Sequence, residues 1–252
     1  MAPLALVGRT LELHRLGLAA QRERVAAEAV EVAAGDDATL LAVVGDRVAA
    51  GRPVLVTAPL PTTPATVDAL VELAAGAAAP VGYAEPVVVS PVAAAGLAAA
   101  AGWALRRVDL VWAAPEGEPT TERARAAALA LAALGGRDLP PATATGWAGE
   151  VEGVAVSVSI DVAASAVDWS LQVVADDHVA RLEWAPLSGV EVDGRPVPVG
   201  SSPEDPAERL LAELGYRALV SGIAGAAAGR GGTVVPLGFA RRVAAALGGA
   251  TT

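Results

Sequence analysis

The first half of the chain alternates short apolar runs with longer segments of helical periodicity. Short strands are predicted at residues 4–7, 30–34, 53–56 and 81–83, and the run at residues 53–56 is continuously apolar, which is typical of a strand buried on both faces. Between them the spacing predicts helices at residues 11–24, 38–50 and 63–75, and Asp37 is expected to cap the second of these. This alternation predicts a parallel sheet covered by helices, an α/β domain at residues 1–104.

The second half of the chain, from residue 105 onward, changes to a period of two. Apolar side chains alternate with polar ones in three predicted strands, at residues 154–162, 169–173 and 182–184. Asp193-Gly194 is a hairpin signal, and helices are predicted at residues 206–228 and 237–247. The pattern predicts an open-faced antiparallel sheet with C-terminal helices, an α+β domain at residues 105–252.

The composition argues against a membrane protein, a nucleic-acid-binding protein and a metal site. The 252 residues are 54% hydrophobic with a formal net charge of -10. No apolar run approaches the ~18 residues that span a bilayer, and the first residues lack the basic segment of a secretion signal, so a cytoplasmic protein is expected. The acidic balance argues against a nucleic-acid partner. With no cysteine and two histidines, neither a thiolate nucleophile nor a metal site is expected.

Several motifs, taken in their order along the chain, resemble one family of oxidoreductases. Residues 49–60 read Ala-Ala-Gly-Arg-Pro-Val-Leu-Val-Thr-Ala-Pro-Leu, and the later segments are Gly215-Tyr216, Ala228-Gly229-Arg230 and residues 236–243. Together they resemble the Gfo/Idh/MocA family of glucose-fructose oxidoreductase and inositol dehydrogenase. The resemblance covers nearly the whole chain and implies a truncated Rossmann-like domain at residues 1–104, followed by the α+β domain. It also implies an NAD or NADP cofactor and a sugar, polyol or related hydroxy compound as substrate.

The glycine loop departs from the pattern that the resemblance implies. A Rossmann domain of this family opens with G-x-G-x-x-G, and the resemblance implies that Gly8, Arg9 and Thr10 lie beside the cofactor. Only one of the glycines is kept. The short distance to the strand predicted at residues 30–34 leaves no room for a second and third strand, and no acidic strand end is identified to hold the ribose. These departures argue against cofactor binding.

The proton-transfer residues of the family are also missing. Thr57-Ala58-Pro59 stands where the resemblance implies Glu-Lys-Pro, with Thr57 and Pro59 beside the cofactor and Ala58 in place of the lysine that assists proton transfer. The whole chain contains no lysine. Residues 121–130, where the family has an Asp and a His, contain Glu122, Arg123 and Arg125 but neither of these. No general acid or base is identified.

The resemblance implies a substrate cleft, for which the candidate residues are Ala58, Tyr83, Glu85 and Arg125. For Tyr83 a position in the core is the alternative, and for Arg125 the alternative is a solvated face of an alanine-rich helix.

Two histidines have alternatives of the same kind. His14 either lines the cofactor loop or packs on its helix, whereas His178, at a turn, is expected to be solvated.

Two classes of function stay open from the sequence. The first is a catalytically degenerate pseudo-oxidoreductase with a role in binding or association. Its predicted sheet face is polar but poor in charge, which suits burial against a second copy or an active paralogue, at Ser157, Ser159, Ser170 and Gln172. The alternative is a divergent NAD(P)-dependent dehydrogenase, because hydride transfer depends chiefly on positioning the cofactor against the substrate. Binding of a small-molecule ligand without chemistry is not separated from the first class.

Overall fold

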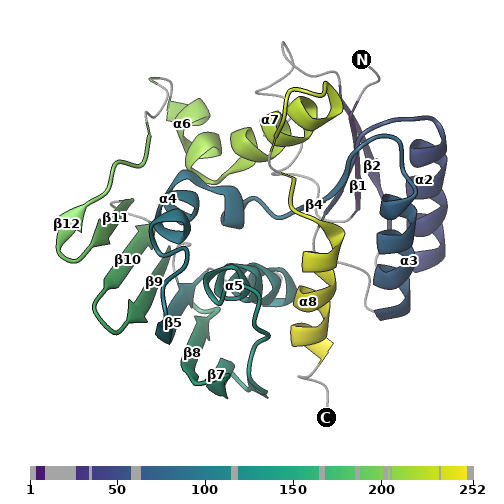
Figure 1. Cartoon of the computed structure of the whole chain (residues 1–252). Helices are drawn as coiled ribbons and strands as arrows, with labels where there is room; N and C mark the ends of the chain where they lie inside the picture. The colour runs from purple at the N-terminus through teal and green to yellow at the C-terminus, as the bar shows by residue number, and fades with distance from the viewer. Residues whose placement is uncertain are drawn as a thin grey trace. The chain divides into compact units, whose positions relative to one another are not determined.

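The structure is a computed structural model that describes residues 4–8, 27–33, 36–57, 64–114, 119–164, 168–184, 188–200, 204, 206–232 and 234–248. The chain forms two compact units. Unit 1 comprises Met1–Val89 and Ser202–Ala245, and unit 2 comprises Ser90–Ser201 and Ala246–Thr252. Figure 1 labels most of their helices and strands.

Unit 1 is built on a four-stranded parallel sheet in the order β2-β1-β3-β4. Its elements are β1 (Leu4–Gly8), β2 (Ala27–Glu31), α2 (Asp37–Ala49), β3 (Val54–Thr57), α3 (Pro64–Ala75), β4 (Val81–Ala84), the 3-10 turn η1 (Val87–Val89), α6 (Pro206–Glu213), α7 (Tyr216–Ala227) and most of α8 (Leu237–Gly248). The continuous apolar run of β3 is buried along its whole length, as the sequence predicted. The parallel Rossmann-like sheet is therefore confirmed.

The position of β2 corrects the sequence prediction. The strand was expected at residues 30–34, with no room before it for the second and third strands of a complete Rossmann half. It lies at Ala27–Glu31 and pairs in parallel with β1, from Leu4 opposite Ala27 to Gly8 opposite Glu31. β2 is the edge strand of this sheet, and its Ala-Glu-Ala-Val-Glu sequence alternates instead of forming the continuous apolar run of a central strand.

The helix α2 begins one residue earlier than predicted. Asp36, not Asp37, is its N-cap, because the Asp36 Oδ1 atom accepts a 3.0 Å hydrogen bond from the backbone N–H of Thr39. Hydrogen bonding from the Thr39 side chain, and then from its backbone, lowers the pKa of Asp36. Asp37 instead accepts a 2.9 Å hydrogen bond from the Thr66 hydroxyl, which joins α2 to α3.

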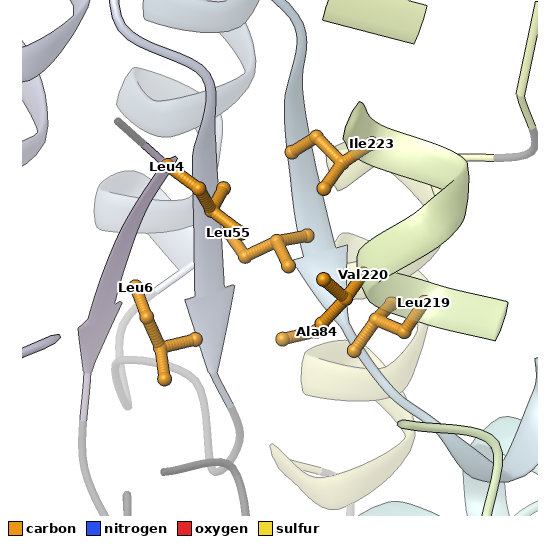
Figure 2. Packing of buried hydrophobic residues seen from close by; sticks show 7 residues of the cluster. All are labelled: Leu4, Leu6, Leu55, Ala84, Leu219, Val220 and Ile223. Carbon is orange, nitrogen blue, oxygen red and sulfur yellow. The ribbon is translucent and has the colours of Figure 1, made fainter. Parts of the chain in front are cut away.

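Helix α7 covers the sheet of unit 1, so the boundary between the units differs from the predicted one. Its residues Leu219, Val220 and Ile223 are buried against side chains of β1, β3 and β4, namely Leu4, Leu6, Leu55 and Ala84 (Figure 2). Each large aliphatic side chain buried in this way contributes about 1.5–3 kcal/mol. The predicted division at residues 104 and 105 assigned this helix to the second domain. The compact units instead divide after Val89, and residues 202–245 belong with the first sheet.

The helix predicted at residues 206–228 is two helices. α6 ends at Glu213, and Gly215 has a φ of 90°, a left-handed conformation that breaks the helix before α7 begins at Tyr216. The final helix is confirmed as α8. Among the described residues, no helix combines the length and the apolar character that crossing a membrane requires.

Unit 2 contains an eight-stranded mixed sheet in the order β12-β11-β10-β9-β5-β8-β7-β6. Its elements are α4 (Pro91–Ala99), β5 (Leu105–Ala113), α5 (Pro119–Ala133), β6 (Ala142–Thr143), β7 (Gly146–Val151), β8 (Val154–Asp161), β9 (Asp168–Ala175), β10 (Val179–Trp184), β11 (Gly189–Val192) and β12 (Arg195–Pro196). The sheet was predicted to be antiparallel. The pairing of β5 with β8 is parallel, because α5 lies between them in the chain as a crossover, and the other neighbouring pairs are antiparallel.

The predicted alternation in this sheet is confirmed, except that Val162 lies in a turn beyond the end of β8. In β8 every second side chain is buried, starting at Val154, and those between are exposed. α4 and α5 lie on the buried face, since Gly96 of α4 packs against Leu182 and Glu122 of α5 bonds to Trp112 (Figure 1). The Asp193-Gly194 hairpin is confirmed too, with φ of 51° and 76° at its two central residues.

Two glycines in the interior of helices should respond oppositely to replacement by alanine. Gly45→Ala in α2 meets no atom within 4 Å, so it should raise the free energy of unfolding by up to about 1 kcal/mol through helix propensity. Gly225→Ala in α7 would place a Cβ against the carbonyl oxygen of Gly231, so it should lower that free energy by about 1–3 kcal/mol. Urea denaturation of both variants measures this. Equal stabilisation by the two would contradict the close packing of α7 on residues 231 and 232.

Candidate functional site

The carboxyl ends of β1, β3 and β4 meet at one edge of the parallel sheet of unit 1. These ends are Gly8, Thr57 and Ala84, and Thr57 lies opposite Ala84 in the ladder. The order β2-β1-β3-β4 reverses direction between β1 and β3, since β2 lies on one side of β1 and β3 on the other. In open parallel sheets a ligand binds beyond the carboxyl ends at such a reversal. Gly8 and Thr57 flank that position.

An acidic residue ends the strand next to Gly8. Glu31 is the last residue of β2 and is paired in register with Gly8. It follows Gly8 by about 20 residues, the spacing at which dinucleotide-binding domains carry the carboxylate for the ribose hydroxyls. The sequence interpretation that no such strand end exists was wrong, because it placed β2 three residues too far along the chain.

Of the other residues predicted to lie beside the cofactor, the described part of the chain includes Thr57. Thr57 is 1% exposed at the end of β3, so the chain enters the Ala58 position from a buried strand. Arg9, Thr10, Ala58 and Pro59 lie outside the described residues, and their roles stay predictions. His14 lies outside them as well.

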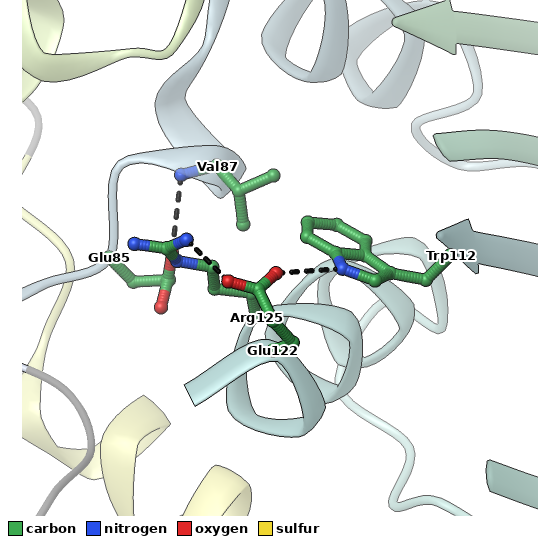
Figure 3. A network of polar contacts seen from close by, with 5 residues as sticks. All are labelled: Glu85, Val87, Trp112, Glu122 and Arg125. Atoms are coloured by element: carbon green, nitrogen blue, oxygen red, sulfur yellow. Dashed lines mark hydrogen bonds and ion pairs between the residues drawn. The ribbon is translucent and has the colours of Figure 1, made fainter. Parts of the chain in front are cut away.

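Tyr83 and Glu85, predicted for the substrate cleft, are both fully buried in unit 1. Tyr83 is 0% exposed within β4, where it pairs with Val56 and donates its backbone N–H to the Val235 carbonyl at 2.8 Å. This agrees with the core alternative for that residue. Glu85 is 1% exposed directly after β4, and its Oε1 atom accepts a 3.3 Å hydrogen bond from the N–H of Val87 (Figure 3).

Arg125 belongs to a polar network inside unit 2. The Glu122 Oε1 atom accepts from an Arg125 guanidinium nitrogen at 2.8 Å, and its Oε2 atom accepts from the Trp112 indole N–H at 2.9 Å (Figure 3). The Glu122 and Arg125 side chains are 13% and 19% exposed, so Arg125 does not lie on the solvated face that was the alternative for it. Because Arg125 is in unit 2 and Tyr83 and Glu85 are in unit 1, their shared role in a cleft stays a prediction.

The described residues hold no group of three or more His, Asp or Glu side chains placed to bind a metal ion. His178 is half-exposed at a turn, as predicted, but it is not merely solvated. Its Nδ1 atom lies 2.8 Å from the Asp193 Oδ2 atom, and its ring stacks on Trp103 with 5.1 Å between the ring centroids. The N–H of Val179, and then the His178 side chain, lower the pKa of Asp193.

Sequence reasoning missed two features, Glu31 and the bond from Trp112 to Glu122. The spacing from Gly8 was the signal for Glu31, and it would have been visible with β2 correctly placed. The second has no sequence signal, because the contact joins β5 to α5 and depends on how that helix crosses the sheet.

The two sheets together have the fold of Gfo/Idh/MocA-type oxidoreductases, as the sequence resemblance predicted. One solved structure with this fold is GenD2 from gentamicin A biosynthesis in complex with NAD. It is 14% identical to this chain with a TM-score of 0.66, and the match covers 98% of this chain and 93% of GenD2.

Two further solved structures have the same fold. UDP-N-acetylglucosamine 3-dehydrogenase GnnA from Acidithiobacillus ferrooxidans is 14% identical with a TM-score of 0.72, covering 98% of this chain and 96% of GnnA. The dehydrogenase MviM from Clostridium difficile is 10% identical with a TM-score of 0.69, covering 98% and 97% of the two chains. No protein-family model and no curated protein sequence matches the chain. At these identities the likeness establishes the fold.

Removing the Glu122 carboxylate should destabilise unit 2. Glu122→Ala takes the acceptor from the buried Trp112 N–H and the ion pair from Arg125, so the free energy of unfolding should fall by about 1–3 kcal/mol. Asp176→Ala is the matched control, because its ion pair with Arg106 is more than half exposed and is expected to contribute about 0–1 kcal/mol. Chemical denaturation compares the two. A larger loss for Asp176→Ala would contradict this assignment.

The lowered pKa of Asp193 predicts a dependence of stability on acid pH. A carboxyl group with a lowered folded pKa stabilises the protein above its unfolded pKa of about 3.9, and that stabilisation is lost as the pH falls through the folded value. Asp193→Asn should therefore lower stability at neutral pH and flatten the acid side of the stability curve. Thermal unfolding across this pH range, with the exposed neighbour Asp177→Asn as control, measures both effects. Identical curves for the two variants would refute the prediction.

Proposed function

We propose that this protein is a catalytically degenerate pseudo-oxidoreductase that binds or associates without transferring a hydride. The observation that carries the proposal is the residue at the position of the family lysine. Ala58 stands where the resemblance implies lysine, and an alanine neither carries charge nor exchanges a proton. No lysine elsewhere in the chain can replace it.

The α5 helix supports the same conclusion. The Asp and His that the resemblance implies are absent from residues 121–130. The one carboxylate there, Glu122, uses one oxygen for Arg125 and the other for Trp112. A carboxylate engaged on both oxygens by an ion pair and a buried N–H holds the helix against β5, and its position is fixed by these contacts. This is a structural role.

The second candidate, a divergent NAD(P)-dependent dehydrogenase for a sugar, polyol or related hydroxy compound, is favoured by Glu31. The register of Glu31 with Gly8 supports a ribose-binding carboxylate beside the strand reversal. Gly8, Thr57 and Glu31 are the described residues that would border a dinucleotide. A bound nicotinamide would supply the hydride acceptor, and Glu31 would favour NAD over NADP, because a carboxylate repels a 2′-phosphate.

The two candidates differ in cofactor binding. We predict no saturable change in tryptophan fluorescence or in unfolding temperature when the protein is titrated with NADH or NADPH into the millimolar range. A ligand that binds the folded state would raise its stability, by about 2.7 kcal/mol at a concentration 100 times its Kd. Saturable binding in the micromolar range would contradict the proposal and favour the dehydrogenase.

If NADH does bind, the variants of β2 identify its site. Glu31→Ala should weaken NADH binding by about 10–100-fold, the loss expected for a hydrogen bond to a charged group, and should weaken NADPH binding less. Glu28→Ala, on the same strand but away from its carboxyl end, is the matched control and should leave both affinities unchanged.

A further inference from the structure

A shallow hollow lies on the large sheet of unit 2, on the face opposite α4 and α5. Its volume is about 250 Å³, and the side chains that surround it on β5, β9 and β10 are Asp109, Val111, Ser170, Gln172, Arg181 and Glu183. The two helices pack on the other face, where Gly96 meets Leu182 and Glu122 bonds to Trp112. The hollow therefore uses none of the residues that border the sheet edge of unit 1.

The strand register explains the shape of the hollow. Pairing places the side chains in two rows across the three strands, the first being Asp109, Gln172 and Arg181 and the second Val111, Ser170 and Glu183. Serine has the shortest of these side chains, and longer ones stand next to it along β9 and on both neighbouring strands. Ser170 is therefore the floor of the recess, with β5 as one wall and β10 as the other.

Several polar side chains of the hollow are available to a ligand. Within the described part of the chain, the side chains of Ser170, Gln172 and Glu183 form no hydrogen bond or ion pair. The Arg181 Nη1 atom lies 3.6 Å from the Glu191 Oε1 atom, which is too long for a hydrogen bond, and the Arg181 side chain is 60% exposed. The β10 wall thus presents one guanidinium and one carboxylate whose donors and acceptors are not taken by close contacts.

The β5 wall offers an apolar contact instead of an available charge. Asp109 is already paired, since its Oδ2 atom lies 2.6 Å from the Arg107 Nε atom. The other residue of this wall, Val111, is 54% exposed. A ligand in the hollow would therefore meet charge on one side and an aliphatic side chain on the other.

The two charges on β10 have opposite signs and a short separation. Arg181 and Glu183 are two residues apart on one face of the strand, so their Cα atoms are separated by about 6–7 Å. A guanidinium binds a carboxylate through paired N–H groups, and a carboxylate accepts from an ammonium group. A molecule that carries both groups on one carbon, together with an aliphatic chain, matches Arg181, Glu183 and Val111 at once.

The size of the hollow limits this molecule further. Pockets that enclose drug-sized ligands have volumes of about 300–1,000 Å³, so a hollow of about 250 Å³ suits a smaller molecule. An α-amino acid with an aliphatic side chain has the required charges and is of this smaller class.

We propose that the hollow binds a free α-amino acid with an aliphatic side chain. Its carboxylate accepts hydrogen bonds from Arg181 and the Gln172 amide, its ammonium group donates to Glu183 and the Ser170 hydroxyl, and its side chain packs on Val111. The inference goes beyond the proposed function and does not depend on whether unit 1 binds a cofactor. A second copy covering this face would use the same side chains, so the two kinds of occupancy exclude each other.

Amide NMR of the full chain, titrated with L-leucine to about 10 mM, tests the proposal. Because the hollow is open to solvent on one side, the dissociation constant should be on the order of 1 mM. The amide signals that shift should be those of residues 109–111, 170–172 and 181–183. Glycine should bind more weakly, because it makes no contact with Val111.

Two leucine derivatives separate the two charged contacts. N-acetyl-L-leucine lacks the ammonium group and L-leucine amide lacks the carboxylate, so each should bind about 10-fold more weakly than L-leucine. Glu183→Gln should remove the preference for L-leucine over N-acetyl-L-leucine, and Arg181→Gln the preference over L-leucine amide. Unchanged amide signals away from the hollow show that each variant is folded.

Matched controls come from the same sheet. Glu150→Gln on β7 and Arg106→Gln on β5 remove exposed charges outside the hollow, and both should bind L-leucine as the wild type does. Three results would overturn the proposal, namely no shift at the hollow, shifts centred elsewhere on the chain, or equal binding of L-leucine and its two derivatives. So would equal losses of affinity in Glu183→Gln and Glu150→Gln.

Discussion

The parallel pairing of β1 with strands on both of its sides is the constraint on which unit 1 depends. Five residues, Leu4–Gly8, pair with β2 along one edge and with β3 along the other. The described side chains of β1 are fully buried as a result. Two of them, Leu4 and Leu6, form part of the apolar surface that α7 covers. The same pairing also brings Gly8, Glu31 and Thr57 to the same edge of the sheet, which is the site that a dinucleotide would use.

A single periodicity determines both faces of the large sheet in unit 2. Because side chains alternate across a strand, the residues that build the buried face under α4 and α5 also fix what appears on the other face. Trp112 faces α5 and bonds to Glu122, whereas its neighbour Val111 is exposed on the opposite face of the sheet. A shift of β5 by one residue would exchange these positions, so the register of β5 specifies the packing of α5.

The sequence predicts the parts of this fold that local periodicity determines. β3, β8 and the Asp193-Gly194 hairpin are predicted well, because burial on both faces, burial on one face and a positive φ each leave a distinct residue pattern. β2 is displaced in the prediction because an edge strand need not be apolar. α4 is missed because its sequence, Pro-Val-Ala-Ala-Ala-Gly-Leu-Ala-Ala, has hardly any polar face to give it a helical period.

The candidate site is less predictable than the fold, since it depends on contacts between elements. Glu31 is recognised as a candidate ribose ligand only because β2 pairs in register with β1, which places it beside Gly8. The role of the ion pair between Glu122 and Arg125 is likewise evident only from the way α5 lies over β5. The loss of the family lysine, in contrast, is visible in the sequence alone at Ala58. The described part of the chain retains the sheet edge at Gly8, Glu31 and Thr57, and the proposed loss of catalysis rests on the residue at position 58.

An assay of hydride transfer tests most directly the proposal that the protein is catalytically degenerate. The purified protein is incubated with NAD or NADP and a panel of sugars and polyols, and the near-ultraviolet absorbance of the reduced nicotinamide is followed. The absence of proton-transferring residues at the family positions predicts no formation of NADH or NADPH above the rate without protein. Sustained formation with any one substrate, proportional to protein concentration and reduced in Glu31→Ala, would show that the protein is an active dehydrogenase.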